Sequence, residues 1–175
     1  IWGLDVFYPL LGEIDPRLAS FGASLRHFHY QWNTLICLIP ILFFAALRST
    51  RNQSQDIIQG LAGSYIIFYG LTDFWAFQYL AWSLPFWFLL GPRMASATYL
   101  LSFAYLYGLY AWLTGSPWLL GDWAFVEKPI WPTALLRIRD ATILVFFVSG
   151  CLLVIRSART GLTRWRETGR PLSWI

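Results

Sequence analysis

Residues 74–91, which read FWAFQYLAWSLPFWFLLG, limit the possible folds more than any other part of the chain. The segment from Phe74 to Leu90 contains no charged residue and is rich in tryptophan and phenylalanine, with one amide, Gln78, and one proline, Pro85, in the apolar run. A transmembrane helix needs about 20 mostly apolar residues to cross the hydrocarbon core of a bilayer, and its Trp side chains favour the interface. This segment therefore predicts a membrane-spanning helix.

The composition of the whole chain also favours a membrane protein. Of the 175 residues, 57% are hydrophobic and 13% are charged, whereas soluble domains typically carry about 25% charged residues. The net charge of +4 comes from basic residues near the ends of apolar segments and in the C-terminal tail. This is not the pattern of a nucleic-acid-binding surface, so we expect membrane lipids, and no nucleic acid, among the partners.

Five apolar segments are long enough, or nearly long enough, to cross a bilayer. They cover residues 27–47, 57–71, 74–90, 94–113 and 134–155. The sequence therefore predicts an all-α integral membrane domain with about five transmembrane helices in residues 27–155. Small residues four positions apart, Gly60 with Ser64 and Ala104 with Gly108, predict close contacts between these helices.

Two further segments flank the predicted spans. Asp15-Pro16 is a typical helix start, and apolar residues then recur with helical spacing at Leu18, Phe21, Leu25 and Phe28. We therefore expect residues 1–26 to form an interfacial segment, with an amphipathic helix lying flat on the membrane. Residues 156–175 carry five arginines and are expected to form a basic cytoplasmic tail.

The distribution of basic residues predicts the orientation. With five spans, one side holds eight of them: Arg48, Arg51, Arg93, Arg156, Arg159, Arg164, Arg166 and Arg170. The other side holds five, namely Arg17, Arg26, Lys128, Arg137 and Arg139. The positive-inside rule then places the C-terminus in the cytoplasm and the Trp-containing loop of residues 114–133 outside. The alternative is that the second and third segments form one long tilted helix.

Arginines at the start of the last span are candidate binding residues. Ionisable groups just inside a span usually face protein, water or a lipid headgroup, and arginine suits phosphate oxygens. Arg137 and Arg139 could therefore bind a lipid phosphate. The alternative is an Arg137–Asp140 ion pair at helical spacing, with the Arg139 side chain extending to the interface.

In the third segment, Gln78 and Trp82 share one helix face, where the amide of Gln78 could bind a polar ligand or hydrogen-bond a neighbouring helix.

His27 and His29 are unsuited to bind a metal or haem together, because residues two apart on a helix point to different faces. Cys37 and Cys151 have no metal-spaced neighbours and are expected to be buried thiols. We expect no cofactor, no metal and no catalytic residue in this chain.

Residues 77–86, Phe-Gln-Tyr-Leu-Ala-Trp-Ser-Leu-Pro-Phe, resemble a "QYLLWLLPF"-type segment near the C-terminal end of polyprenyl-phosphate-sugar-dependent glycosyltransferases of the GT-C fold. Leu135-Leu136-Arg137 is similar to the start of a later span in that family. The resemblance implies that Gln78, Tyr79, Trp82, Arg137 and Arg139 line a site for the sugar or the lipid phosphate. In the family the catalytic acid lies in a large first outer loop, and no part of residues 1–175 matches that loop.

The resemblance thus implies the C-terminal membrane part of such an enzyme, a fragment or truncated relative that shapes a lipid-phosphate groove without being catalytic by itself. Its partners would be a polyprenyl-phosphate sugar and the N-terminal half of the enzyme. It would lie in the bacterial inner membrane. The alternative is a non-catalytic accessory subunit of a larger photosynthetic or respiratory membrane complex, packed against other subunits. A transporter is a third possibility, but no intramembrane charge pathway supports one.

Overall fold

The computed structural model describes residues 3–49, 54–73, 79–80, 85, 87–121 and 130–168. Helices and turns account for these residues, and no strand occurs among them. The elements are η1 (Leu4–Phe7), α1 (Tyr8–Ile14), η2 (Pro16–Leu18), α2 (Ala19–Ser49), α3 (Ser54–Leu71), η3 (Phe88–Leu90), α5 (Pro92–Thr114) and α6 (Thr133–Thr168). The all-helical prediction is therefore confirmed for the described part of the chain.

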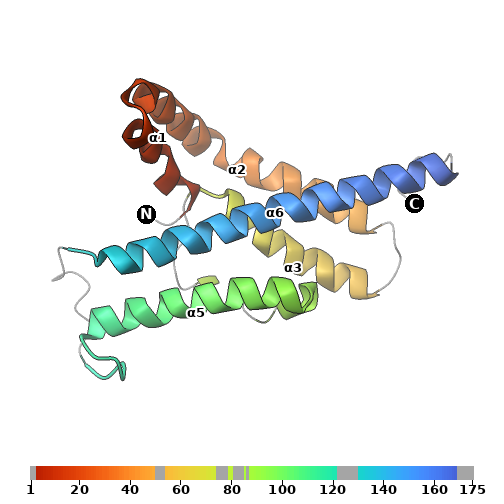
Figure 1. The fold of residues 1–175 in the computed structure, drawn as a ribbon. Helices are drawn as coiled ribbons and strands as arrows, with labels where there is room; N and C mark the ends of the chain where they lie inside the picture. Colours follow the sequence, from red (N-terminus) through yellow and green to blue (C-terminus); the bar gives the residue numbers. More distant parts are fainter. Residues whose placement is uncertain are drawn as a thin grey trace.

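Helix α6 is the element around which the others assemble (Figure 1). It contacts α2, α3 and α5, and α2 also contacts α3 and α1. Figure 1 shows that α2 and α6 run in one direction, whereas α3 and α5 run in the opposite direction. Helices α3 and α5 therefore run the same way, antiparallel to α6.

Several predicted boundaries agree with the structure. Helix α3 ends at Leu71, as the second predicted span does, and α5 covers the fourth predicted span with two more residues at its start. Asp15 caps the next element as expected, because its Oδ1 accepts a hydrogen bond of 2.9 Å from the N–H of Arg17. Most of the predicted third span, including Gln78 and Trp82, lies outside the described residues.

Two long helices continue across predicted divisions of the chain. Helix α2 runs without a break from Ala19 to Ser49, so it includes part of the predicted interfacial segment and the whole first predicted span. Likewise α6 does not stop near Ile155 and continues to Thr168, so much of the predicted tail is helical.

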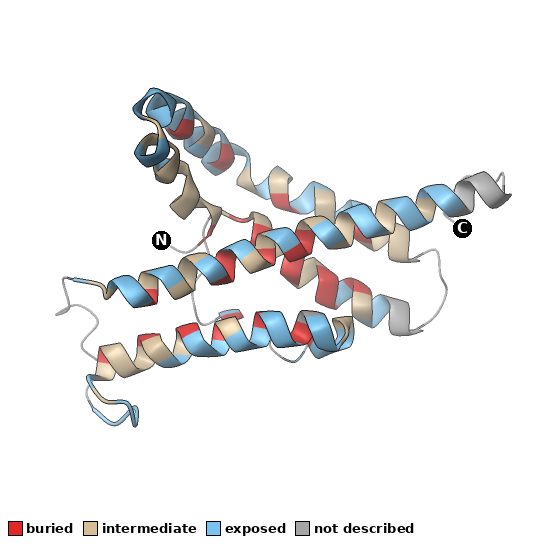
Figure 2. Cartoon of the chain, in the orientation of Figure 1, coloured by how far each residue is buried: buried red, intermediate tan, exposed pale blue. Residues whose placement is uncertain are grey.

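Among the described residues, two helices, rather than the five predicted spans, meet the length and apolarity needed to cross a membrane. They are residues Pro16–Arg48 and Thr133–Thr163, and the apolar part of α3, Ile57–Leu71, is a shorter apolar helix. Helix α5 is long enough, but its tyrosines and serines lower its apolarity. Only 11% of the most apolar stretch of the first helix and 28% of that of the second are buried, which Figure 2 shows as exposed stretches along α2 and α6.

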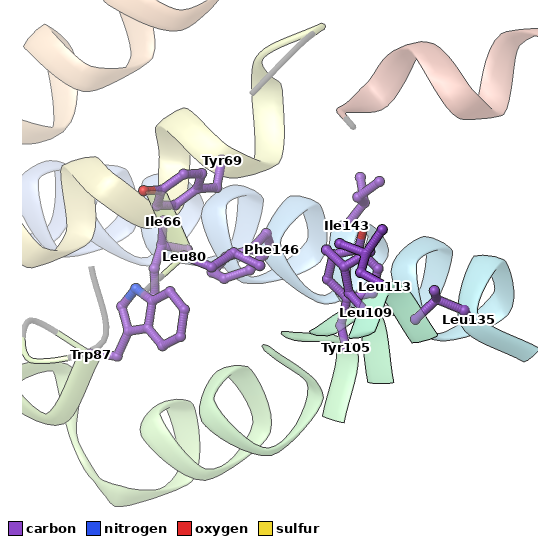
Figure 3. Packing of buried hydrophobic residues seen from close by; sticks show 10 residues of the cluster. All are labelled: Ile66, Tyr69, Leu80, Trp87, Tyr105, Leu109, Leu113, Leu135, Ile143 and Phe146. Atoms are coloured by element: carbon purple, nitrogen blue, oxygen red, sulfur yellow. The ribbon is translucent and has the colours of Figure 1, made fainter. Parts of the chain in front are cut away.

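The hydrophobic core lies between α3, α5 and α6 (Figure 3). Phe146 of α6 packs against Tyr69 of α3, with ring centroids 5.4 Å apart, and against Trp87, at 5.0 Å. Leu80 and Trp87 are both fully buried in this core. Two residues of the aromatic segment 74–91 therefore pack inside the bundle. The remaining core residues are Ile66, Tyr105, Leu109, Leu113, Leu135 and Ile143.

Glycine permits the close approach of α3 to α6. A Cβ atom at Gly70 would lie 2.6 Å from the backbone oxygen of Phe146, and one at Gly150 would lie 3.2 Å from the Cα of Ile67. The predicted contact at Gly60 is not close, because a Cβ there would meet only the Cβ of Arg48 at 3.9 Å. Gly108 is close to α6, since its Cβ would lie 3.3 Å from Leu135.

Candidate functional site

The predicted site residues that the structure describes have different surroundings. Gln78 and Trp82 lie outside the described residues. Tyr79 is 41% exposed, and its backbone oxygen accepts a hydrogen bond of 2.5 Å from the hydroxyl of Tyr69 on α3. Arg137 is exposed on the first turns of α6. The structure thus associates Tyr79 with α3 and leaves the role of Arg137 as a prediction.

Arg139 is engaged with its neighbour on α6. Its Nε and Nη2 atoms donate hydrogen bonds of 2.9 and 2.7 Å to Oδ1 of Asp140, and both side chains are partly buried. The carboxylate expected to pair with Arg137 is therefore paired with Arg139 instead. Adjacent helix residues do not normally face each other, so the length of the arginine side chain allows this pair.

A polar cluster joins the N-terminal segment to the bundle where α3 ends. The amide of Asn33 on α2 accepts a hydrogen bond of 3.0 Å from the N–H of Asp73, and its Nδ2 donates one of 3.4 Å to Oγ1 of Thr72. The backbone N–H of Leu4 donates to the backbone oxygen of Thr72 at 3.0 Å. The partly buried side chain of Asn33 thus provides hydrogen-bond partners for Thr72 and Asp73, where the chain leaves α3.

His29 lies beside this cluster and is only 2% exposed. Its Nδ1 atom hydrogen-bonds the hydroxyl of Tyr8, and the two rings meet edge to face with centroids 5.6 Å apart. Burial raises the pKa of Tyr8 to about 12, with the negative charges of Asp5 and Asp73 as smaller causes. A tyrosine with this pKa stays protonated at physiological pH and acts as a hydrogen-bonding group.

Arg26 and Asp5 form a second link between α2 and the N-terminal segment. The guanidinium Nε lies 2.5 Å from Oδ1 and Nη2 lies 2.8 Å from Oδ2, which is a bidentate pair. Twenty-one residues of sequence separate the two partners. These contacts fasten the N-terminal segment, including η1 and α1, to the side of α2.

A second region lies at the opposite end of the bundle, where sequence reasoning predicted no site. Here a cavity of about 550 Å³ is bordered by three arginines from three helices, Arg48 of α2, Arg93 of α5 and Arg156 of α6. We call it the three-arginine pocket. Its other lining residues are Leu90, Gly91, Pro92, Ala97, Leu152, Leu153 and Ser157. None of the described residues that line the pocket is acidic.

The elements explain how the arginines come together. The end of α2, the start of α5 and the C-terminal half of α6 lie at the same end of the bundle (Figure 1). Arg48 is held in place by stacking over the ring of Phe44, 5.7 Å from its centroid, and by a hydrogen bond of 3.3 Å to Oε1 of Gln59 on α3. Arg93 and Arg156 are exposed at the rim.

The two regions differ in the chemistry they offer. The polar cluster near α1 consists of groups that satisfy one another, whereas the pocket collects positive charge without a lining acid. Guanidinium groups of this kind suit phosphate and carboxylate oxygens. Among the described residues, no group of three His, Cys, Asp or Glu side chains could hold a metal ion. Anion binding is therefore the chemistry best represented on the described surface.

One signal in the sequence indicated the pocket. Arg48, Arg93 and Arg156 each stand at the end of an apolar segment, and charge counting placed all three on the same side. Their convergence depends on how α2, α5 and α6 are rotated about their axes, which residue order alone does not define. No protein family, no curated protein sequence and no solved structure matches the chain.

Proposed function

We propose that this chain is a membrane-embedded, non-catalytic helical region that forms part of a lipid-dependent membrane enzyme or assembly. In this proposal α2, α3, residues 74–90, α5 and the first two-thirds of α6 cross the bilayer, with the C-terminus in the cytoplasm. The observation that carries the proposal is the exposure of apolar side chains on the longest helices. The most apolar stretch of the helix Pro16–Arg48 is only 11% buried.

The exposed apolar residues of α2 support membrane embedding. Ile39 is 61% exposed, Leu42 57% and Phe43 46%, within one and a half turns of helix. Monomeric soluble proteins rarely expose contiguous apolar patches of this kind. The core helix of a soluble domain would bury these side chains, whereas a transmembrane helix presents them to lipid or to another membrane protein.

The arrangement of the helices supports the topology. The directions of the described helices fit the proposed crossings, because α2 and α6 run one way and α3 and α5 run the other (Figure 1). Arg48, Arg93 and Arg156 then lie on one side and Arg26 and Arg137 on the other. Because basic residues are retained in the cytoplasm, this places the three-arginine pocket on the cytoplasmic side.

The family resemblance gives the role a more specific form. The segment around Gln78 and Tyr79 resembles lipid-carrier-dependent glycosyltransferases, so the helices would shape a groove for a polyprenyl-phosphate sugar while another part of the assembly supplies catalysis. The polar groups near α1 support a non-catalytic role, because Asn33 and Tyr8 make hydrogen bonds that join chain segments. In this role Arg137 remains the candidate for a phosphate on the outer side.

The second candidate is an accessory subunit of a larger membrane complex, and one observation favours it. The outer face of α2 carries an apolar hollow of about 320 Å³ lined by Phe28, Trp32, Leu35, Ile36, Ile39 and Pro40. An apolar hollow lined by aromatic and aliphatic side chains is suited to packing against side chains of a helix from another subunit.

Membrane extraction and topology mapping test the proposal. We expect the chain to stay in the membrane pellet after alkaline carbonate washing, and a green fluorescent protein fused after Thr168 to be fluorescent in bacterial cells. Release of the chain by carbonate would contradict the proposal. Purification in mild detergent then separates the two candidates. A partner recovered at fixed stoichiometry favours the accessory subunit, and retention of a polyprenyl phosphate favours the glycosyltransferase-like role.

A further inference from the structure

We infer that the three-arginine pocket binds the phosphate headgroup of an anionic lipid in the cytoplasmic leaflet. The inference rests on the membrane embedding proposed above, but it concerns a different site from the one that the family resemblance implies. It follows from three features of the pocket: the depth of its arginines, the chemistry of its walls and the helix end that borders it.

The three arginines lie at one depth, one bilayer core away from the other end of the bundle. A helix rises 1.5 Å per residue, so the distance along α2 from Arg26 to Arg48 is about 33 Å. The distance along α6 from Thr133 to Arg156 is about 35 Å by the same rise, and Arg93 begins a helix of similar length. The hydrocarbon core is about 30 Å thick, so all three guanidinium groups lie at the headgroup level.

The walls of the pocket suit an amphiphile rather than a free ion. Leu90, Leu152 and Leu153 line the cavity together with the arginines. Leu152 is 41% exposed. A lipid can therefore place its phosphate among the guanidinium groups while its chains extend along these aliphatic residues. A soluble anion would leave the aliphatic walls uncovered.

The start of α5 strengthens the attraction for an anion. Gly91 precedes this helix with a φ of +103°, a conformation that favours glycine, and no side chain caps the helix. The first backbone N–H groups of a helix have no partner within it and carry partial positive charge. Together with the guanidinium of Arg93, they direct a positive field into the pocket. Zwitterionic phosphocholine carries its own cation and gains less from this field.

Lipid binding to the purified full chain tests the inference. We expect native mass spectrometry of the chain in detergent to show saturable binding of phosphatidylglycerol, with much weaker binding of phosphatidylcholine. The double substitution Arg93→Gln and Arg156→Gln removes two charge-assisted contacts, so binding should weaken at least about tenfold. Both residues are exposed, so the bundle should still fold.

Arg17→Gln is the control, because Arg17 is an exposed arginine at the opposite end of the bundle and does not line the pocket. It should leave binding unchanged. Equal affinity of wild type and the double variant would overturn the inference, as would equal binding of the two lipids. Displacement of the lipid by millimolar inorganic phosphate would mean that the site recognises a soluble anion instead. Carbonate extraction of the same variants is a separate readout, because loss of membrane retention would contradict the embedding and not the pocket.

Discussion

Tyr8 and His29 are hydrogen-bonded across twenty-one residues of sequence, and this bond joins α1 to the side of α2. The imidazole is almost completely buried, at 2% exposure, and accepts or donates at Nδ1 according to its tautomer. The bidentate pair of Arg26 with Asp5 and the asparagine cluster at Thr72 lie in the same region. The N-terminal segment is therefore held against α2 and the end of α3 by several hydrogen bonds and an ion pair.

The first prediction concerns this hydrogen bond. Tyr8→Phe leaves a buried imidazole nitrogen without its partner, so the free energy of unfolding should fall by about 1–3 kcal/mol. Thermal unfolding of the chain in detergent, followed by circular dichroism, measures the effect. Tyr107→Phe is the control, because the Tyr107 hydroxyl donates an exposed hydrogen bond of 2.8 Å to the backbone oxygen of Pro117. Equal losses in the two variants would contradict a special role for Tyr8.

The second prediction is a pH dependence that arises from Tyr8. Its pKa is raised to about 12 in the folded chain, first by burial and then by the charges of Asp5 and Asp73, whereas an unfolded tyrosine has a pKa of about 10. The unfolded state thus loses this proton first as pH rises. The stability contribution is complete below about pH 10 and is lost between about pH 10 and 12.

This dependence can be isolated by comparison with Tyr8→Phe. Wild type should lose stability relative to the variant as pH rises from 10 to 12, while the other tyrosines titrate in both proteins and cancel. Urea unfolding in mild detergent at several alkaline pH values provides the measurement. Parallel curves for the two proteins across this range would show that the pKa of Tyr8 is not raised by folding.

Residue patterns predicted those elements that are marked by local signals. Helix α5 begins at Pro92, which is a favourable first helical residue, and ends before Gly115 in a left-handed conformation. Helix α3 ends where Thr72 begins a polar turn. These signals act within a few residues, so they can be read from the chain itself.

Contacts between distant residues could not be predicted from the residue order. The pair of Arg26 with Asp5 joins residues twenty-one positions apart, and the close crossing of α3 and α6 occurs at Gly70 and Gly150 rather than at Gly60. Small residues four apart permit contact, but the rotation of each helix decides which of them is used. The candidate pocket has the same origin, because it needs three helices to align their arginines.

The third prediction tests the α3–α6 crossing. Gly70→Ala would place a Cβ 2.6 Å from the backbone oxygen of Phe146, and the two helices must separate to accept it. We expect a loss of about 1–3 kcal/mol in the free energy of unfolding. Gly60→Ala is the control, since its Cβ would make an ordinary contact at 3.9 Å, and alanine should stabilise the helix by about 0.5–1 kcal/mol. Opposite signs for the two variants, measured by unfolding in mixed micelles, are the expected result.

The fourth prediction concerns Phe146, whose ring lies between those of Tyr69 and Trp87 in the core (Figure 3). Phe146→Ala leaves a cavity where α3, α6 and the end of the aromatic segment meet, and should cost about 3–5 kcal/mol. Phe103→Ala removes the same side chain from a position that is 55% exposed, so it should cost much less. Tryptophan fluorescence should also change more for Phe146→Ala, because Trp87 loses a ring neighbour at 5.0 Å. If both variants unfold at the same temperature as wild type, the segment around Trp87 does not depend on α6 for its packing.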